Sequence, residues 1–216
     1  MSATFLAPPP ERPSSIEPGD EPHTLQDLYA MMAKAEAPGP GQGRFVPGEG
    51  RPHAALLFVG EQPGDQEDIL GRPFVGPAGQ LLDRALDEAG ISRAETYVTN
   101  AVKRFHFTQR GKKRLHQKPS TDEIRRERWW LYREIDLVAP RLVVALGGTA
   151  LQALAGKVLP VTQLRGPVRF ADDRAGYITV HPSSLLRQPD PDVRQRSYAA
   201  FLDDLRKAGQ LADALD

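Results

Sequence analysis

Two histidines lie in segments whose composition could support catalysis. His181 follows the apolar run GYITV and begins the segment HPSSLLR, whereas His116 lies in residues 104–121, where Arg and Lys are mixed with Phe and His. An imidazole can donate a hydrogen bond to an oxygen that becomes anionic, and its unperturbed pKa lies close to neutral pH. Basic residues mixed with aromatic ones suit contacts with phosphates and stacked bases. The plainer interpretations are a structural histidine at a strand end and a solvated charged loop.

Residues 60–79, GEQPGDQEDILGRPFVGPAG, form a third candidate segment. It leaves an apolar run, turns at Pro63-Gly64 and leads into a helical pattern at Pro77. Gly76 and Gly79 would let a phosphate approach the backbone at the start of that helix. The glycine spacing matches neither a P-loop nor a dinucleotide-binding fingerprint, and an acidic surface loop is an equally good interpretation.

Asn100 ends a further apolar run, ETYVTN. Its side-chain amide carries a donor and an acceptor together, which complements the edge of a nucleic-acid base. A single Asn at the end of a strand is more often a turn former. Asn100 therefore supports base recognition only together with the residues that the fold places beside it.

Strands and helices alternate along the part of the chain that carries these residues. Apolar runs predict strands and helical spacing predicts helices, with strands at 53–60, 95–102, 141–148, 168–170 and 176–180, and helices from Thr24 and at 77–90, 120–138, 149–156 and 193–208. Residues 37–51 and 105–119 are expected to lack regular structure. The alternation predicts an α/β fold, a three-layer α/β/α sandwich with a mainly parallel central sheet. In such folds ligands bind at the carboxyl ends of the strands, where the segments at Gly60, Asn100, Gly147 and His181 would meet.

Composition sets limits on the rest of the chain. Lys and Arg together number 28, as do Asp and Glu, so a wholly electrostatic nucleic-acid binder is not expected, although a local basic patch is compatible with this balance. The sequence has no cysteine, which excludes disulfides, thiolate zinc sites and iron–sulfur clusters bound by its own thiolates. Residues 1–22 are rich in Pro and Ser and predict a disordered or loosely packed tail before a single domain at 23–216. No signal peptide or membrane-spanning run is recognised, so a cytoplasmic location is expected.

Four segments, in their order along the chain, resemble the uracil-DNA glycosylase superfamily over about residues 23–207. They are GEQPGDQED, GRPFVGPAG, VTNAVK and HPSSLLR, of which the first stands at the family's motif A and HPSS at its motif B. The stretch KKRLHQKPS is similar to the Arg–aliphatic–His loop of the UdgX class, whose members bind uracil-DNA covalently through the loop histidine. GEQPGDQED is also similar to that class, whereas the ordinary iron–sulfur glycosylases typically read GEAPG.

The resemblance implies roles for individual residues. Phe74 would stack on a flipped-out uracil, Asn100 would read its edge, and the region of Asp65 would exclude the methyl group of thymine. His181 would stabilise charge on uracil O2, and Gln62 stands where some relatives keep a water-activating aspartate. Glu61 would orient water or His116, and His116 would attack the sugar. The expected DNA contacts are Lys112, Lys113, Arg114, Lys118, Ser183, Ser184 and Arg187.

One departure from the family concerns the iron–sulfur cluster of those relatives. Places held there by cysteines are occupied here by His23, Gln26 and Glu127, so no cluster, and no other cofactor or metal, is expected. Its structural role would pass to other packing, for which Tyr29, Trp129 and Trp130 are the candidates.

The sequence is compatible with three functions. The first is a covalent trap for uracil-DNA with His116 as the nucleophile, and the second is a turning-over glycosylase that uses Glu61 and His181. The third is a non-catalytic nucleic-acid-binding protein. The expected partner is uracil-containing DNA, preferably single-stranded, and the protein is expected to be a monomer, without a membrane partner, in the nucleoid region of the cytoplasm.

Overall fold

A seven-stranded sheet forms the centre of the computed structural model, which describes residues 3–4, 10–35, 38–170 and 173–215. The strand order is β1-β9-β10-β8-β4-β5-β3. The strands β4 (Leu56–Gly60), β5 (Tyr97–Asn100), β8 (Leu142–Leu146) and β10 (Ala175–Thr179) run parallel to one another. The strands β9 (Gly166–Arg169) and β3 (Glu49–Gly50) are antiparallel to their inner neighbours, and β1 (Ala3–Thr4) pairs in parallel with β9. The predicted α/β fold with a mainly parallel sheet is confirmed.

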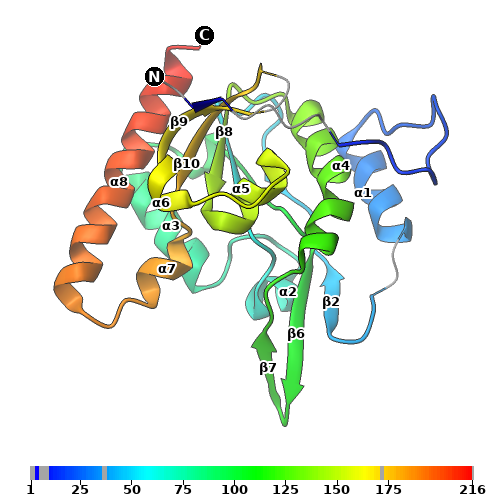
Figure 1. The fold of residues 1–216 in the computed structure, drawn as a ribbon, viewed down its shortest axis with the longest axis horizontal. Coiled ribbons are helices and arrows are strands. Elements are labelled where there is room, and N and C mark those ends of the chain that lie inside the picture. Colours follow the sequence, from blue (N-terminus) through cyan, green and yellow to red (C-terminus); the bar gives the residue numbers. More distant parts are fainter. Residues whose placement is uncertain (1–2, 5–9, 36–37, 171–172, 216) are drawn as a thin grey trace.

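Helices cover both faces of this sheet (Figure 1). One face carries α3 (Pro77–Glu88) and α8 (Pro191–Asp213), and the other carries α4 (Thr121–Val138) and α5 (Gly147–Ala155). Successive strand residues point to opposite faces, so Leu57 and Val59 pack under α4 and α5 while Leu56 and Phe58 pack under α3 and α8. Outside α4 lies α1 (Leu25–Ala35). None of the helices within the described ranges is long and apolar enough to cross a membrane.

Helix α4 begins and ends where its sequence predicts. The Ser120 hydroxyl accepts a hydrogen bond from the Glu123 backbone N–H, and the Glu123 carboxylate accepts one from the Ser120 backbone N–H. This reciprocal pair satisfies two N–H groups that would otherwise lack partners at a helix start. The helix ends at Val138, and Ala139 follows in the left-handed region with φ 49°. The order of the remaining helices also follows the prediction, with α8 extending further at both ends than the expected 193–208.

The segment at 105–119 is not the irregular loop that its lack of periodicity predicts. It forms a β-hairpin of β6 (Arg104–Arg110) and β7 (Lys113–His116), and β2 (Gln42–Phe45) joins it to make a second, three-stranded sheet. The hairpin extends from the body of the protein below α4 and α2 (Asp65–Leu70) in Figure 1. Phe107 pairs with His116 within the hairpin, and Gln42 of β2 pairs with His106. The residues of β7 and of the outer half of β6 are exposed or half-buried, so these strands lack the alternation of buried and exposed side chains by which local periodicity predicts a strand.

Other elements were also not predicted. Within residues 37–51, expected to be irregular, lie β2 and β3, while residue 37 itself lies outside the described residues. Within residues 60–79, α2 (Asp65–Leu70) follows Gly64, and its residue Glu67 accepts hydrogen bonds from the backbone N–H groups of Gly64 and Gly76. The described residues also form three short elements, which are the helices α6 (Val161–Leu164) and α7 (Pro182–Leu186) and the 3-10 turn η1 (Arg93–Glu95).

The described part of the N-terminal segment contacts the domain. Ile16 is only 6% exposed and packs with Leu28, Met32 and Trp130. The carbonyl oxygen of Pro22 accepts hydrogen bonds of 2.9 and 2.7 Å from Arg133 on α4. Residues 1–2 and 5–9 of the expected tail lie outside the described residues. A separate tail at 1–22 and a single domain at 23–216 stay predictions.

Candidate active site

A cavity of about 990 Å³ opens at the carboxyl ends of β4, β5, β8 and β10. It brings together predicted site residues from four separate segments of the chain. Those that line it are Glu61, Gln62, Asp65, Phe74, Asn100, His116, Lys118, His181, Ser183, Ser184 and Arg187. Three predicted DNA contacts on the hairpin, Lys112, Lys113 and Arg114, do not line it.

Phe74 and Asn100 line the cavity, and Gly60 lies directly beside both side chains. A Cβ atom on Gly60 would lie 2.4 Å from Asn100 Oδ1 and 2.6 Å from Phe74 Cζ, so only glycine at position 60 leaves room for both side chains. Phe74 has a φ of 56°, and a Cβ on Gly79 would lie 1.8 Å from its carbonyl oxygen. The first turn of α3 therefore packs directly on this strained backbone and holds the Phe74 ring at the wall.

His181 presents a neutral ring with a defined tautomer. Its Nδ1 accepts a hydrogen bond of 3.1 Å from the Ser183 backbone N–H, which leaves the ring proton on Nε2. Burial lowers the pKa of His181 to about 4, against the opposing effect of the Glu61 carboxylate. The ring lies 6.3 Å from that of Phe74 at an interplanar angle of 27°. A neutral Nε2–H beside an aromatic wall can donate to a carbonyl oxygen that gains negative charge.

Three of the predicted DNA contacts hold His181 in this position. The Ser183 hydroxyl lies 2.8 Å from His181 Nδ1 and accepts a hydrogen bond of 3.0 Å from Arg187. The Ser184 hydroxyl donates to the His181 carbonyl at 2.7 Å. Their contacts with DNA remain predictions, whereas their contacts with the histidine explain why the segment HPSSLLR folds as a helix start.

Glu61 connects the hairpin to the sheet. Its Oε1 lies 3.2 Å from Nε2 of His116, and its Oε2 accepts a hydrogen bond of 2.6 Å from Thr149 at the start of α5. Burial alone would raise the pKa of Glu61, but the hydrogen bonds from His116 and Thr149, with a smaller electrostatic effect of the two nearby imidazole rings, lower it to about 2. Glu61 is therefore a carboxylate. Thr149 was missed by the sequence analysis, where its only signal was a hydroxyl in the first turn of an apolar helix after a strand.

Gln62 is tied to the base of the hairpin. Its Nε2 donates to the Gln117 carbonyl at 2.9 Å, and its Oε1 accepts from the His106 backbone N–H at 3.3 Å. The amide thus bridges β6 and the residue that follows His116. Because both ends of the amide are engaged with backbone groups, Gln62 can position the hairpin but has no basic group with which to activate water.

Arg114 and Asp65, predicted to contact DNA and uracil, are bound to each other. Arg114 Nε lies 2.6 Å from Asp65 Oδ1, and the same guanidinium pairs with Asp68. The guanidinium also lies over the rings of Phe105 and Phe107, at 5.4 and 5.1 Å from their centroids. These contacts hold the hairpin against α2. The lysines at 112, 113 and 118 are exposed, and Lys118 is at the cavity.

The places that the family resemblance assigns to cluster cysteines are not arranged to hold a metal here. His23 and Gln26 are exposed, and Glu127 lines a cavity of only about 10 Å³, room for about one water molecule. Trp130 fills the neighbourhood together with Ile16 and Met32, and the rings of Trp129 and Trp130 meet edge to face at 4.9 Å. Within the described ranges no group of three or more His, Asp or Glu side chains is arranged to hold a metal ion.

Comparison with known proteins agrees with this geometry. The family model of the uracil DNA glycosylase superfamily matches residues 47–206. The chain is 38% identical to a type-4 uracil-DNA glycosylase of Thermotoga maritima over 165 residues, which cover 76% of this chain and 80% of that protein. It is 36% identical over 154 residues to a type-4 uracil-DNA glycosylase of Sulfurisphaera tokodaii, covering 67% of each. A type-5 uracil-DNA glycosylase of Thermus thermophilus is 35% identical over 122 residues, 53% of this chain and 56% of that one. The chain belongs to the uracil DNA glycosylase superfamily.

Proposed function

We propose that the protein recognises uracil in DNA, breaks the bond between uracil and its deoxyribose, and stays attached to the sugar through His116. The observation that carries the proposal is the pair of His116 and Glu61, 3.2 Å apart, at the cavity that Asn100, Phe74 and His181 also line. The names of the relatives support uracil excision, and the pair supports the covalent step.

Recognition begins with extrusion of the uracil nucleotide from its stack, which costs a few kcal/mol. The base enters the cavity against the Phe74 ring, and the Asn100 amide accepts from N3–H and donates to O4. Cytosine presents an acceptor and a donor at the same two places, so the same amide disfavours it. Gly60 supports this arrangement because no larger residue leaves room for the Asn100 amide.

Cleavage moves the electrons of the glycosidic bond onto the base. As the bond between N1 and C1′ breaks, uracil O2 gains negative charge and the deoxyribose becomes an oxocarbenium-like electrophile. The neutral His181 donates from Nε2 to O2, an interaction that strengthens as the charge develops.

Attachment follows when an imidazole nitrogen of His116 gives its lone pair to C1′. The ring becomes an imidazolium in this step, and the Glu61 carboxylate beside it stabilises the positive charge. The imidazolium then loses its N–H proton, and the uracil anion takes one up from solvent, so atoms and charge balance. Gln62, which is occupied with the hairpin backbone, does not activate a competing water.

Two other functions give different products. In a turning-over glycosylase, the ionised Glu61 activates water and His116 only contacts DNA. In a non-catalytic binding protein, the bond between uracil and its deoxyribose stays intact, and no bond to His116 forms. The proposal further includes single-stranded uracil-DNA as the preferred partner, a monomeric state and a place in the cytoplasm near the nucleoid. The exposed lysines of the hairpin support the DNA contact.

A denaturing gel separates these functions. The protein is mixed with an end-labelled single-stranded oligonucleotide that contains one deoxyuridine, and with matched oligonucleotides that contain cytosine or thymine. The covalent trap gives a shifted band that survives heating in detergent, whereas the turning-over enzyme gives free uracil and an abasic strand, and the binding protein gives neither. His116→Ala is expected to lose the shifted band. The matched control is His106→Ala, because His106 lies on the same hairpin but pairs with Glu123, 3.0 Å away, and not with the cavity.

A further inference from the structure

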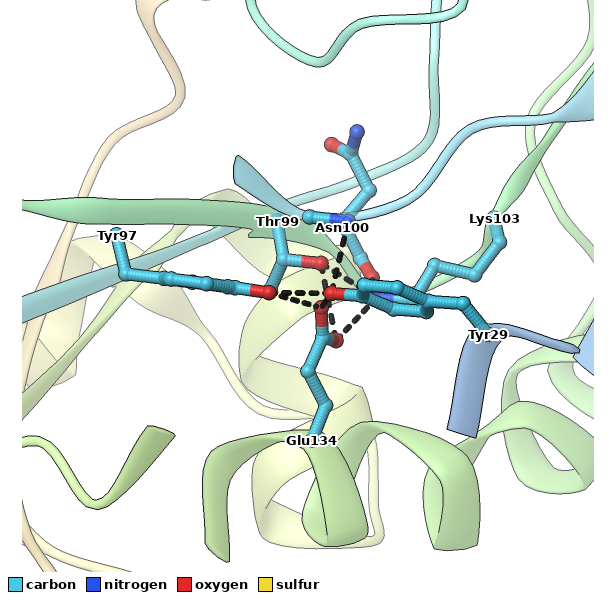
Figure 2. Close-up of polar contacts among 7 residues, drawn as sticks. Tyr29, Tyr97, Thr99, Asn100, Lys103 and Glu134 are labelled. Carbon is cyan, nitrogen blue, oxygen red and sulfur yellow. Dashed lines mark hydrogen bonds and ion pairs between the residues drawn. The ribbon is translucent and has the colours of Figure 1, made fainter. Parts of the chain in front are cut away.

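A buried ion pair lies directly behind Asn100. Lys103 Nζ and Glu134 Oε2 are 2.5 Å apart, and their side chains are 1% and 0% exposed. Lys103 follows β5, and Glu134 lies on the face of α4 that packs on the sheet (Figure 2). Burial of two charges is costly, and a well-packed apolar pair often stabilises a fold as well or better. The pair therefore calls for a reason other than stability.

Every hydrogen-bonding group of the pair has a partner. Lys103 Nζ donates to Glu134, to the Thr99 hydroxyl at 2.5 Å and to the Asn100 carbonyl at 2.8 Å. The Glu134 carboxylate accepts from Lys103 and Thr99 through Oε2, and from Tyr29 and Tyr97 through Oε1 at 2.5 and 3.2 Å. Burial and the neighbouring Glu134 carboxylate raise the pKa of both tyrosines above its usual range, so both hydroxyls keep their protons and donate.

The network contacts Asn100 from the side opposite to its amide. In β5, Tyr97 and Thr99 point toward α4, and the alternation of the strand turns Asn100 to the other face. Figure 2 shows the Asn100 amide directed away from Glu134, while its backbone carbonyl meets Lys103. Gly60, the partner of Asn100 on the neighbouring strand β4, lies beside the amide, and a Cβ atom there would lie 2.4 Å from Oδ1. Gly60 therefore confines the side chain, while Lys103 holds the backbone carbonyl of the same residue.

We propose that Lys103 and Glu134 are positioning residues that fix the Asn100 amide in the orientation that reads uracil. Recognition by a single amide depends on direction, because its donor and acceptor must each face the right atom of the base. The carbonyl held by Lys103 belongs to the same residue as that amide, so a loss of this contact leaves the peptide after Asn100 with its N–H bond to the Gly60 carbonyl and without the bond from Lys103. This inference rests on the proposed role of Asn100 as the reader of uracil.

The test uses the double variant Lys103→Met with Glu134→Gln. Methionine fills the space of the lysine without its charge, and glutamine keeps an oxygen to accept from Tyr29 and Tyr97 and an amide to donate to Thr99. The double variant thus buries no unpaired charge and removes the donor to Asn100. Tyr29→Phe is the matched control, since it removes a hydrogen bond from the same network and leaves the contact between Lys103 and Asn100 in place.

Binding is measured with two DNAs that cannot be cleaved. One carries 2′-deoxypseudouridine, which presents a uracil-like edge on a carbon–carbon bond, and the other carries a tetrahydrofuran abasic site. The wild type and Tyr29→Phe are expected to prefer the pseudouridine DNA. The double variant is expected to lose at least about tenfold of that preference, the size of one misdirected polar contact, and to keep its affinity for the abasic DNA. Its unfolding midpoint should remain near that of the control.

Each other outcome has a distinct meaning. A folded double variant with the wild-type preference overturns the positioning role, and so does a Tyr29→Phe variant that loses as much preference as the double variant. If the wild type itself shows no preference for pseudouridine over the abasic site, the proposed reading by Asn100 fails instead. If the double variant does not fold, Lys103→Met alone decides, because Tyr29, Tyr97 and Thr99 still donate to Glu134 in that variant. An unchanged preference in Lys103→Met overturns the proposal.

Discussion

Nε2 of His116, at the end of β7, lies 3.2 Å from Oε1 of Glu61, which directly follows β4. The two residues come from different sheets, so their distance depends on how the hairpin is seated. Gln62 holds the base of the hairpin, and Arg114 holds it against α2 through Asp65 and Asp68. His116 is thus held at the cavity by contacts on two sides of the hairpin.

Replacement of Glu61 by Gln should slow attachment to DNA more than it weakens binding. A carboxylate stabilises the imidazolium that forms on attack, and a hydrogen bond to a charged group contributes about 1.5–3 kcal/mol. The single-turnover crosslinking rate is expected to fall by roughly 10- to 100-fold. Glu123→Gln is the control, because Glu123 pairs with His106 and does not line the cavity. A wild-type rate for Glu61→Gln would leave the carboxylate without a role in the covalent step.

His181→Ala should affect bond cleavage far more than DNA affinity. The hydrogen bond from Nε2 strengthens only as charge builds on O2, and loss of such a donor costs on the order of 3 kcal/mol in the barrier. The comparison is between the rate of uracil release under single-turnover conditions and the dissociation constant for DNA with an abasic-site analogue. Equal losses in both would make His181 a binding residue only.

The depressed pKa of His181 also predicts how stability changes with pH. The folded protein holds this ring neutral down to about pH 4, whereas the unfolded chain takes up a proton near the ordinary value of 6.5. The stabilisation that the neutral His181 ring gives to the fold is therefore fully present above pH 6.5. It is lost as the pH falls toward 4, at up to about 1.4 kcal/mol of unfolding free energy per pH unit. Thermal unfolding midpoints between pH 7.5 and 4.5 should fall less in His181→Ala than in the wild type. His23→Ala, at an exposed histidine, should follow the wild type, and parallel curves for all three would contradict the shift.

Local sequence patterns predicted the sheet and the positions of its carboxyl ends. Apolar runs identified the parallel strands, and the Ser120 capping box identified the start of α4, because both signals lie within a few consecutive residues. Asn100 and His181 could be found for the same reason, since each directly follows such a run. The rule that ligands bind where parallel strands end then predicts that they lie at one site.

Pairing across long stretches of sequence was not predictable in this way. The hairpin is held by β2, by Gln62 and by Arg114 with the carboxylates of α2. None of these contacts produces a periodic pattern in the sequence. Lys103 and Glu134 left a weaker sign, a charge directly after an apolar run and an acid on the apolar face of a helix. A charge at a buried position implies a partner, but only the fold shows which residue it is.

The clamp at the base of the hairpin can be tested with Gln62→Met. The substitution keeps the volume and removes the hydrogen bonds to His106 and Gln117, so the hairpin should open more often. Amide hydrogen exchange in residues 104–117 is expected to accelerate, and crosslinking should slow by about tenfold, the cost of roughly one lost hydrogen bond. Unchanged exchange together with slower crosslinking would instead indicate that Gln62 acts directly on the substrate.

Deletion of residues 1–22 should lower stability and leave uracil-DNA capture intact. Among residues 10–22 none lines the cavity, whereas Ile16 is buried against Trp130, and burial of a side chain of this size stabilises a fold by about 1.5–3 kcal/mol. In a protein of this length that corresponds to a fall of the unfolding midpoint by roughly 3–12 °C. Ile16→Asp in the full chain should reproduce the fall, and Glu17→Ala, at an exposed neighbour, should not. Loss of capture at a temperature where the truncated protein is still folded would make the segment part of the DNA site. An unchanged midpoint would mean that the packing at Ile16 contributes nothing measurable to the stability of the fold.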